Sequence, residues 1–179
     1  MRNITSFLQV LLFSFLLLSS PNANAAEQEH ALKAGFLYNF ARYGNWQDNT
    51  TKDEYFNLCS ADAAFVDTAQ STLKQRSVDD KPILIKQIQF EGEQFNHCQL
   101  LFITSETFIQ WVNWHNVHPK ALANTMIVGE SKGTIEAGGH IRFFIASGKV
   151  RFEISPQQLQ QSGITMSSKV LRLGRVLDR

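Results

Sequence analysis

The sequence predicts a single α/β domain in which helices cover both faces of a mixed sheet. Short apolar runs typical of strands alternate along the chain with segments of helical periodicity, which is the order expected of a partly parallel sheet. Near the C-terminus two β-rich runs, Ile141–Ala146 and Lys149–Ile154, are separated only by Ser147-Gly148, a pair typical of a two-residue hairpin loop. We therefore expect a three-layer, Rossmann-like domain whose sheet ends in an antiparallel hairpin.

The helices and strands are expected from the spacing of apolar residues. Helical segments carry them at intervals of three and four, whereas strands are short β-rich or uninterrupted apolar runs. An aromatic-rich stripe in the first helix is more typical of a core than of a ligand surface. In chain order we expect a helix at 30–43, a strand at 55–60, a helix at 63–76, a charged connection at 77–81, a strand at 82–90, a buried strand at 98–104, a helix at 106–115 capped by Ser105, a strand at 125–129 and the hairpin.

Two helices are expected after the hairpin. Ser155 can cap the first, with Pro156 at its first position, and Gly163 stands where that helix would stop. Ser167 or Ser168 can cap the second. Its helical spacing predicts one broad buried face formed by Val170, Leu171, Leu173, Val176 and Leu177.

The first 25 residues have the order of a secretory signal peptide. Arg2 precedes an apolar run at 7–18, and Ala23-Asn24-Ala25 supplies a small-x-small cleavage site. The run is shorter than the roughly 20 residues that span a bilayer. We expect cleavage after Ala25 and export of residues 26–179, with no direct membrane insertion afterwards. A retained membrane anchor is the alternative.

The charge and the cysteine content indicate which binding functions are not expected and how the cysteines are paired. The formal net charge is +1 with no basic block, so nucleic acid binding is not expected. Cys59 and Cys98 are the only cysteines, and in an oxidising compartment an even pair is most simply a disulfide. A metal site is the less favoured alternative, because only His97 adjoins them.

No catalytic, cofactor or metal site is predicted. The chain lacks G-x-G-x-x-G, G-x-x-x-x-G-K-[ST] and G-x-S-x-G motifs. His115 and His118 are spaced to share a helix face, but no third ligand accompanies them. A hydrolase that uses Ser168 or His140 is a third hypothesis, although no base, nucleophile and oxyanion site can be assembled around either.

One polar surface stands out in the second strand of the hairpin. Glu153 alternates with Phe152 and Ile154, so it lies on the opposite face, which Arg151 shares. That face is either simply solvated or part of a recognition patch. The patch would bind a protein partner through Arg151, Glu153, Ser167, Ser168, Lys169 and Arg172.

Two segments resemble the two ends of the YfiR family of exported proteins. The first, residues 33–46, reads KAGFLYNFARYGNW, and its Lys-Ala start, Phe-Leu-Tyr-Asn-Phe centre and closing Trp match the family pattern. The second, residues 150–176, matches through Arg-Phe-Glu-Ile, Gly163, Ser167-Ser168-Lys169 and a Leu-rich end. Together they span almost all of residues 26–179. Pro156 departs from the Asn-Leu that usually follows Arg-Phe-Glu-Ile.

The resemblance implies a non-enzymatic periplasmic regulator without a cofactor. Family members repress an inner-membrane diguanylate cyclase by binding its periplasmic sensor domain, which lowers cyclic-di-GMP and biofilm formation, and they form dimers. Cys59 and Cys98 match the family disulfide that supports folding. The alternative is a small-molecule-binding module with a cleft at the carboxyl ends of the parallel strands, lined by Trp46 or Trp111.

Overall fold

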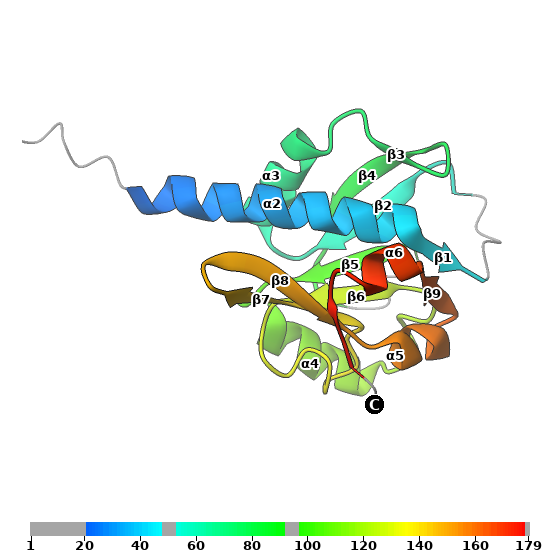
Figure 1. Cartoon of the computed structure of the whole chain (residues 1–179). Coiled ribbons are helices and arrows are strands. Elements are labelled where there is room, and N and C mark those ends of the chain that lie inside the picture. Colours follow the sequence, from blue (N-terminus) through cyan, green and yellow to red (C-terminus); the bar gives the residue numbers. More distant parts are fainter. Residues whose placement is uncertain (1–20, 48–52, 92–96, 178–179) are drawn as a thin grey trace, which may run out of the picture.

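Eight strands of the described chain form one mixed sheet with helices on both faces (Figure 1). The computed structural model describes residues 21–47, 53–91 and 97–177. The sheet strands are β2 (Phe56–Ser60), β3 (Ser77–Val78), β4 (Lys81–Gln87), β5 (Leu100–Ile103), β6 (Met126–Gly129), β7 (Ile141–Ala146), β8 (Lys149–Ile154) and β10 (Arg175–Val176). The helices are α2 (Pro21–Tyr43), α3 (Ala63–Thr72), α4 (Phe108–Val117), α5 (Pro156–Gln161) and α6 (Ser168–Leu171).

The strand order, β10-β8-β7-β6-β5-β2-β4-β3, confirms the predicted α/β architecture. Strands β4, β2, β5, β6 and β7 run parallel to one another, whereas β3 is antiparallel to β4 and β8 is antiparallel to β7. The edge strand β10 is parallel to β8. A separate two-stranded ribbon pairs β1 (Gly44–Trp46) with β9 (Ile164–Met166). This ribbon joins the end of α2 to the segment before α6, so the two segments that resemble the YfiR family lie side by side.

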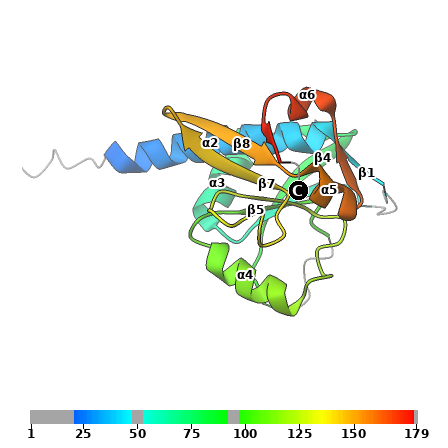
Figure 2. The same cartoon turned by 60° about the horizontal axis from the view of Figure 1, so that its bottom comes forward.

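Helices α2 and α3 cover one face of the sheet and α4 covers the other (Figures 1 and 2). The larger core cluster lies beneath α2 and α3, where Phe40 contacts Phe143 and Phe152 with ring centroids 5.8 and 4.9 Å apart. A smaller cluster beneath α4 is centred on Trp111 and the Cys59–Cys98 disulfide. The aromatic stripe of α2 is therefore largely core, as its spacing predicts.

The hairpin forms as the sequence predicts. Ala146 pairs with Lys149, and Ser147 and Gly148 both take positive φ angles of 52° and 69°, as a type I′ turn requires. Ser155 caps α5 by accepting a hydrogen bond from the Gln158 backbone N–H, with Pro156 at the first position. The hairpin and the first half of α2 extend to the same side of the molecule (Figures 1 and 2).

Several expected elements differ from the structure. Helix α2 begins at Pro21 rather than at residue 30, and α3 ends at Thr72. The expected charged connection at 77–81 is a second hairpin, in which Asp79 and Asp80 take positive φ angles between β3 and β4. The predicted Ser105 cap is wrong, because the residue before α4 is Thr107, and its side chain accepts no hydrogen bond from the first turn of the helix.

The predicted second C-terminal helix is mostly wrong. Helix α6 has a single turn, after which the chain becomes the edge strand β10. Leu173 is 72% exposed and Val176 40% exposed, so they bury no face. At Gly174 the chain lies too close to β8 for a side chain, because a Cβ there would be 2.2 Å from the ring of Phe152, and β10 then pairs parallel to β8.

The predicted signal peptide lies mostly outside the described residues, and only its last five residues fall within α2. Among the described helices, none is long and apolar enough to cross a membrane.

Candidate partner-binding site

The structure places Glu153 inside a charge network rather than on an open patch. It lies on the opposite face from Phe152 and Ile154, as alternation predicts, but it is only 6% exposed. Its two carboxylate oxygens accept hydrogen bonds from Arg142, at 2.5 Å, and from Arg175. Both arginines stand directly opposite Glu153, one in β7 and the other in β10.

This network lowers the pKa of the Glu153 carboxyl group. Burial alone would raise that pKa, but the hydrogen bonds and positive charges of Arg142 and Arg175 outweigh it. Both guanidinium groups also lie over the ring of Phe144, at 5.4 and 5.0 Å from its centroid. Glu153 therefore joins three strands and presents no free carboxylate to a partner.

The remaining members of the predicted patch lie around the β8 and β10 edge of the sheet. Arg151 is exposed on the face of Phe144, its cross-strand partner in β7. Helix α6 lies on the other face, where Val170 joins the α2 core. The patch therefore wraps around an edge instead of forming one flat surface.

Helix α6 is attached to the end of α2. The Ser167 backbone N–H is donated to the Tyr43 carbonyl at 2.9 Å, and the Ser167 hydroxyl caps α6 by accepting from Lys169 N–H. Ser168, Lys169 and Arg172 are exposed, with the Lys169 ammonium 5.9 Å from the Tyr43 ring centroid. The end of α2 contributes Arg42, whose guanidinium lies over Tyr38 and Tyr43. We define the α2–α6 surface as Arg42, Tyr43, Ser168, Lys169 and Arg172.

A second charge network lies at the carboxyl end of β6. The Lys33 ammonium in α2 bonds Glu130, which follows β6, and Glu29 one helical turn earlier, at 2.5 Å. Glu130 also accepts the Ser105 backbone N–H at 2.7 Å. Burial would lower the pKa of Lys33, but the two carboxylates raise it above its usual value. The Lys-Ala start of the N-terminal motif thus fixes α2 to the sheet.

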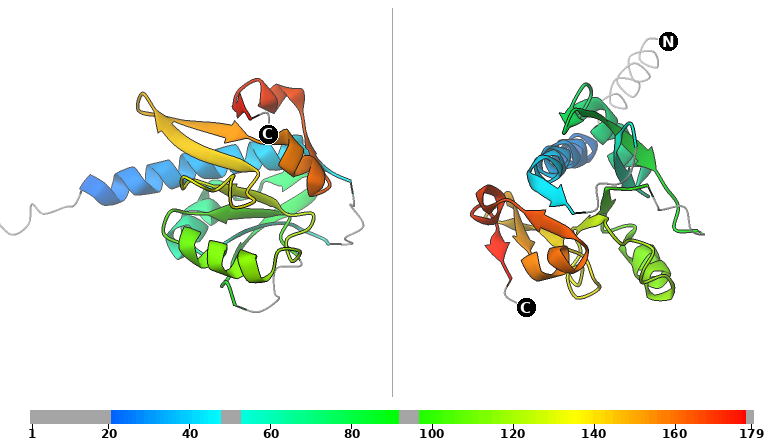
Figure 3. Two further views of the ribbon diagram at one scale, coloured as in Figure 1. Left: turned by 90° about the horizontal axis from the view of Figure 1, so that it is seen from below. Right: turned by 90° about the vertical axis from the view of Figure 1, so that its right-hand side faces the viewer.

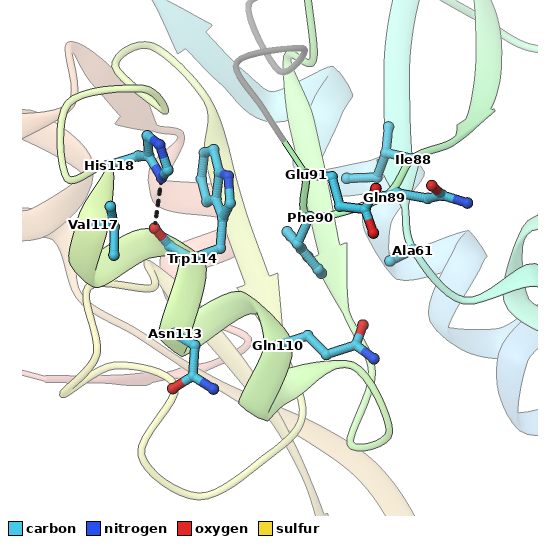
Figure 4. Close-up of a pocket in the computed structure, with 10 residues that line it drawn as sticks. All are labelled: Ala61, Ile88, Gln89, Phe90, Glu91, Gln110, Asn113, Trp114, Val117 and His118. Carbon is cyan, nitrogen blue, oxygen red and sulfur yellow. Dashed lines mark hydrogen bonds between the residues drawn. The ribbon is translucent and has the colours of Figure 1, made fainter.

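An open pocket of about 710 Å³ lies between α4 and the segment after β4 (Figure 4). Ala61 follows β2 and Ile88 follows β4, so the pocket is at the carboxyl ends of parallel strands, where ligands commonly bind in α/β sheets. Trp114 lines it, whereas Trp111 is fully buried and Trp46 packs against Phe56. The two tryptophans predicted to line such a cleft therefore do not do so.

Both ring nitrogens of His140 are engaged in hydrogen bonds, which leaves neither free to act as a general base. The Ile127 backbone N–H is donated to Nδ1 at 2.8 Å, so in the neutral ring the proton is on Nε2 and is donated to the Ser162 hydroxyl, 2.9 Å away. Burial, with a smaller effect of His115, lowers the pKa of His140 to about 4. Ser168 is the exposed first residue of α6, on a different element. The arrangement stabilises the start of β7 and activates no nucleophile.

Cys59 and Cys98 form the predicted disulfide, with Cα atoms 5.9 Å apart. Cys59 lies in β2, and Cys98 precedes the neighbouring strand β5. The bond thus links two central strands under α4, and the two cysteines are 0% and 6% exposed.

These features define a three-layer α/β domain in which the segments at residues 33–46 and 150–176 meet through the β1–β9 ribbon. A family model described as YfiR/HmsC-like matches residues 30–175. The chain therefore belongs to the YfiR/HmsC-like family. A search of curated proteins finds no match.

Proposed function

We propose that the chain is an exported, non-enzymatic regulator that binds the periplasmic sensor domain of an inner-membrane diguanylate cyclase and represses it. Membership of the YfiR/HmsC-like family carries this proposal. The signal-like N-terminus and the disulfide support a periplasmic location, because disulfides persist in oxidising compartments. Repression would lower cyclic-di-GMP and biofilm formation, and the repressor would act as a homodimer.

The α2–α6 surface is our candidate for the contact with the cyclase. It combines exposed cations with Tyr43, and arginine and aromatic side chains are enriched where proteins recognise each other. Its backbone is held in place by the β1–β9 ribbon and by the Ser167–Tyr43 hydrogen bond. Binding there would therefore require little ordering of the repressor.

The disulfide supports the fold in this proposal. Because both cysteines are buried, a reductant would reach them only after local opening. The chain-entropy model gives on the order of 4 kcal/mol for closing a loop of this length, out of the roughly 5–15 kcal/mol that stabilises a domain. Reduction would thus end repression by weakening the repressor itself.

Deletion of the gene and complementation with surface variants test the proposal. Deletion should raise the cellular level of cyclic-di-GMP, and complementation with the wild-type chain should lower it to its original value. The wild-type chain should also co-purify with a cyclase from solubilised membranes. The double variant Lys169→Glu, Arg172→Glu should lower recovery of the cyclase at least tenfold, since it reverses two charges at the contact.

The matched control is Lys120→Glu, Lys132→Glu, which reverses two exposed charges in loops away from α6. It should repress as the wild type does. Unchanged cyclic-di-GMP after deletion, with no cyclase in the eluate, would refute the proposed function. Equal recovery with both double variants would refute only the assignment of the surface.

A further inference from the structure

Over most of its length, the outer edge of β4 has no neighbouring strand among the described residues. Strand β3 pairs only with Lys81 and Pro82, and the Ile83 N–H is donated to the Arg76 carbonyl at 3.0 Å. From Leu84 onward, no strand of the described chain lies on that side. In Figure 3 (right) this edge and the α6–β10 region lie on opposite sides of the molecule. Open edges of this kind are sites where another chain can add a strand.

The pairing of β4 with β2 shows which backbone groups face outward. Ile88 donates its N–H to the Ser60 carbonyl at 3.0 Å, on the β2 side. Because successive residues of a strand point their backbone groups to opposite sides, Ile85, Gln87 and Gln89 direct theirs to the outer edge. No described residue is hydrogen-bonded to these groups on that edge. They form a row of donors and acceptors that only another extended backbone matches in spacing.

Side chains beside this row distinguish the two faces of the edge. Ile85 is buried toward α3, whereas Leu84, Lys86 and Ile88 point to the α4 side. Leu84 is 38% exposed, and Ile88 lines the 710 Å³ pocket together with apolar atoms of Val117. Lys86 is half-buried, and no described carboxylate forms a salt bridge with it. An apolar, a cationic and another apolar position therefore follow one another along the α4 side.

We propose that residues 84–89 bind an extended segment of a partner protein, which adds a strand to the sheet. The segment has an acidic side chain opposite Lys86, flanked two residues away on each side by apolar side chains opposite Leu84 and Ile88. Main-chain hydrogen bonds to Ile85 and Gln87 supply affinity, and the acid and the pocket supply specificity. This contact is separate from the α2–α6 surface. Where repression is used to test it, the test rests on the proposed function.

A second copy of this chain fits the edge less well. Three symmetric antiparallel pairings of two copies are possible along this edge. A pairing centred on Ile85 puts Leu84 of the other copy opposite Lys86, and one centred on Gln87 puts Ile88 there. A pairing centred on Lys86 puts the two Lys86 side chains opposite each other. None of these supplies an anion, and the last one apposes two like charges, which is destabilising. The pairing centred on Ile85 also requires the Ile83 N–H as a donor to the second copy, but that N–H is already donated to the Arg76 carbonyl. The charge at Lys86 therefore selects a different, acidic partner.

Proline at position 87 tests the backbone contact. Because the Gln87 N–H faces outward, Gln87→Pro removes an edge donor while leaving the hydrogen bonds to β2 in place, as proline permits on edge strands. Gln87→Ala keeps that donor and is the matched control. Both variants should retain the wild-type thermal unfolding midpoint. Gln87→Pro should recover about tenfold less partner from solubilised membranes and fail to restore repression, whereas Gln87→Ala should behave as the wild type.

Lys86→Glu provides a second test that does not depend on proline. This variant should also recover about tenfold less partner from solubilised membranes. The control Lys74→Glu, which changes an exposed residue after α3, should recover as much partner as the wild type. Gln87→Pro or Lys86→Glu variants that fold and repress as their controls do would overturn the proposal. The proposed function would then still stand, because deletion would still raise cyclic-di-GMP.

A photocrosslinker at Leu84 identifies the occupant directly. In the full-length chain expressed in its own cell envelope, we expect cross-links to one segment of another protein with an acid between alternating apolar residues. Cross-links to a second copy of the chain, or none, would overturn the proposal. This result is decisive even where deletion leaves cyclic-di-GMP unchanged and the proposed function has failed.

Discussion

Two buried charge networks in this molecule have opposite compositions. In one, the Lys33 ammonium lies between Glu130 and Glu29, and in the other the Glu153 carboxylate lies between Arg142 and Arg175. The central side chains are 6% and 8% exposed. Each has one partner that is 15% exposed and another that is about half exposed. In both, two opposite charges offset the cost of burying one.

The two networks differ in what they join. Lys33 connects a helix to the carboxyl end of β6 across two layers, and Glu130 also fixes the backbone after β5 through Ser105. Glu153 joins three adjacent strands within one layer, at an edge where Arg175 is already 58% exposed. Water can therefore replace a lost partner of Glu153 more readily than one of Lys33. The comparison predicts a larger stability cost when the inter-layer network is broken.

Removal of the Glu130 charge should have the largest effect on stability. Glu130→Gln keeps an oxygen that can accept from Ser105 N–H, but it leaves the Lys33 ammonium buried with only the half-exposed Glu29. Removing one partner of a buried pair costs several kcal/mol, and we expect about 3 kcal/mol in the free energy of unfolding. Chemical denaturation at pH 7 measures this loss.

The control for this change is Glu106→Gln, which alters an exposed carboxylate before α4 and should change the free energy by less than about 0.5 kcal/mol. A Glu130→Gln protein as stable as the control would show that Glu29 and water suffice for Lys33. The two networks would then be equivalent in energy.

The same comparison shows what the sequence could and could not predict. Arg142 could have been placed beside Glu153, because a two-residue loop that pairs Ala146 with Lys149 also pairs Arg142 with Glu153. The position of Arg175 could not have been predicted, since Leu173 and Val176 have helical spacing and the pairing of β10 with β8 brings Gly174 against Phe152, 22 residues earlier in the chain. A local pattern carries no information about such a long-range contact.

The predictable parts of the fold are those whose signals are local. Turn chemistry at Ser147-Gly148 and the cap at Ser155 determine their own neighbourhoods, and the apolar runs that form β5 and β6 can only be buried. Lys33 and Glu130 are 97 residues apart, and nothing in either segment indicates the other. The α6 members of the candidate surface are among the residues that the sequence predicts. Arg42 and Tyr43 are not, because nothing in their own helix indicates that α6 lies beside its end.

Neutralising Glu153 should have a smaller effect, with a distinctive dependence on pH. Glu153→Gln removes the charge that both arginines bind, and we expect a loss of about 2 kcal/mol at pH 7, since one arginine can turn to solvent. The folded pKa of Glu153 is below the unfolded value of 4.5, so its contribution is present above pH 4.5 and is lost as pH falls through the folded pKa.

The difference between wild-type and Glu153→Gln stability isolates this contribution. His140 also destabilises the fold as pH falls from 6.5 toward its folded pKa of about 4, by up to about 3 kcal/mol, because the unfolded chain binds a proton in this range and the buried imidazole does not. That term is present in both proteins and cancels. A difference that stayed constant from pH 7 to pH 2 would contradict the assignment of Glu153 as the ionised centre of the network.

Removing the exposed partner of each network should have the smallest effects. Glu29→Gln and Arg175→Gln each leave the central charge with its less exposed partner, so we expect less than about 1 kcal/mol from either at low salt. Arg175→Gln should cost more than Glu29→Gln, because its guanidinium also lies 5.0 Å from the Phe144 ring centroid. About 0.5 M salt should shrink the Glu29 effect more than the Arg175 effect, since screening weakens an exposed ion pair but not the contact with the ring. Equal salt sensitivity of the two variants would mean that Arg175 stabilises the fold through its charge alone. The exposed partners of the two networks, Glu29 and Arg175, would then stabilise it in the same way.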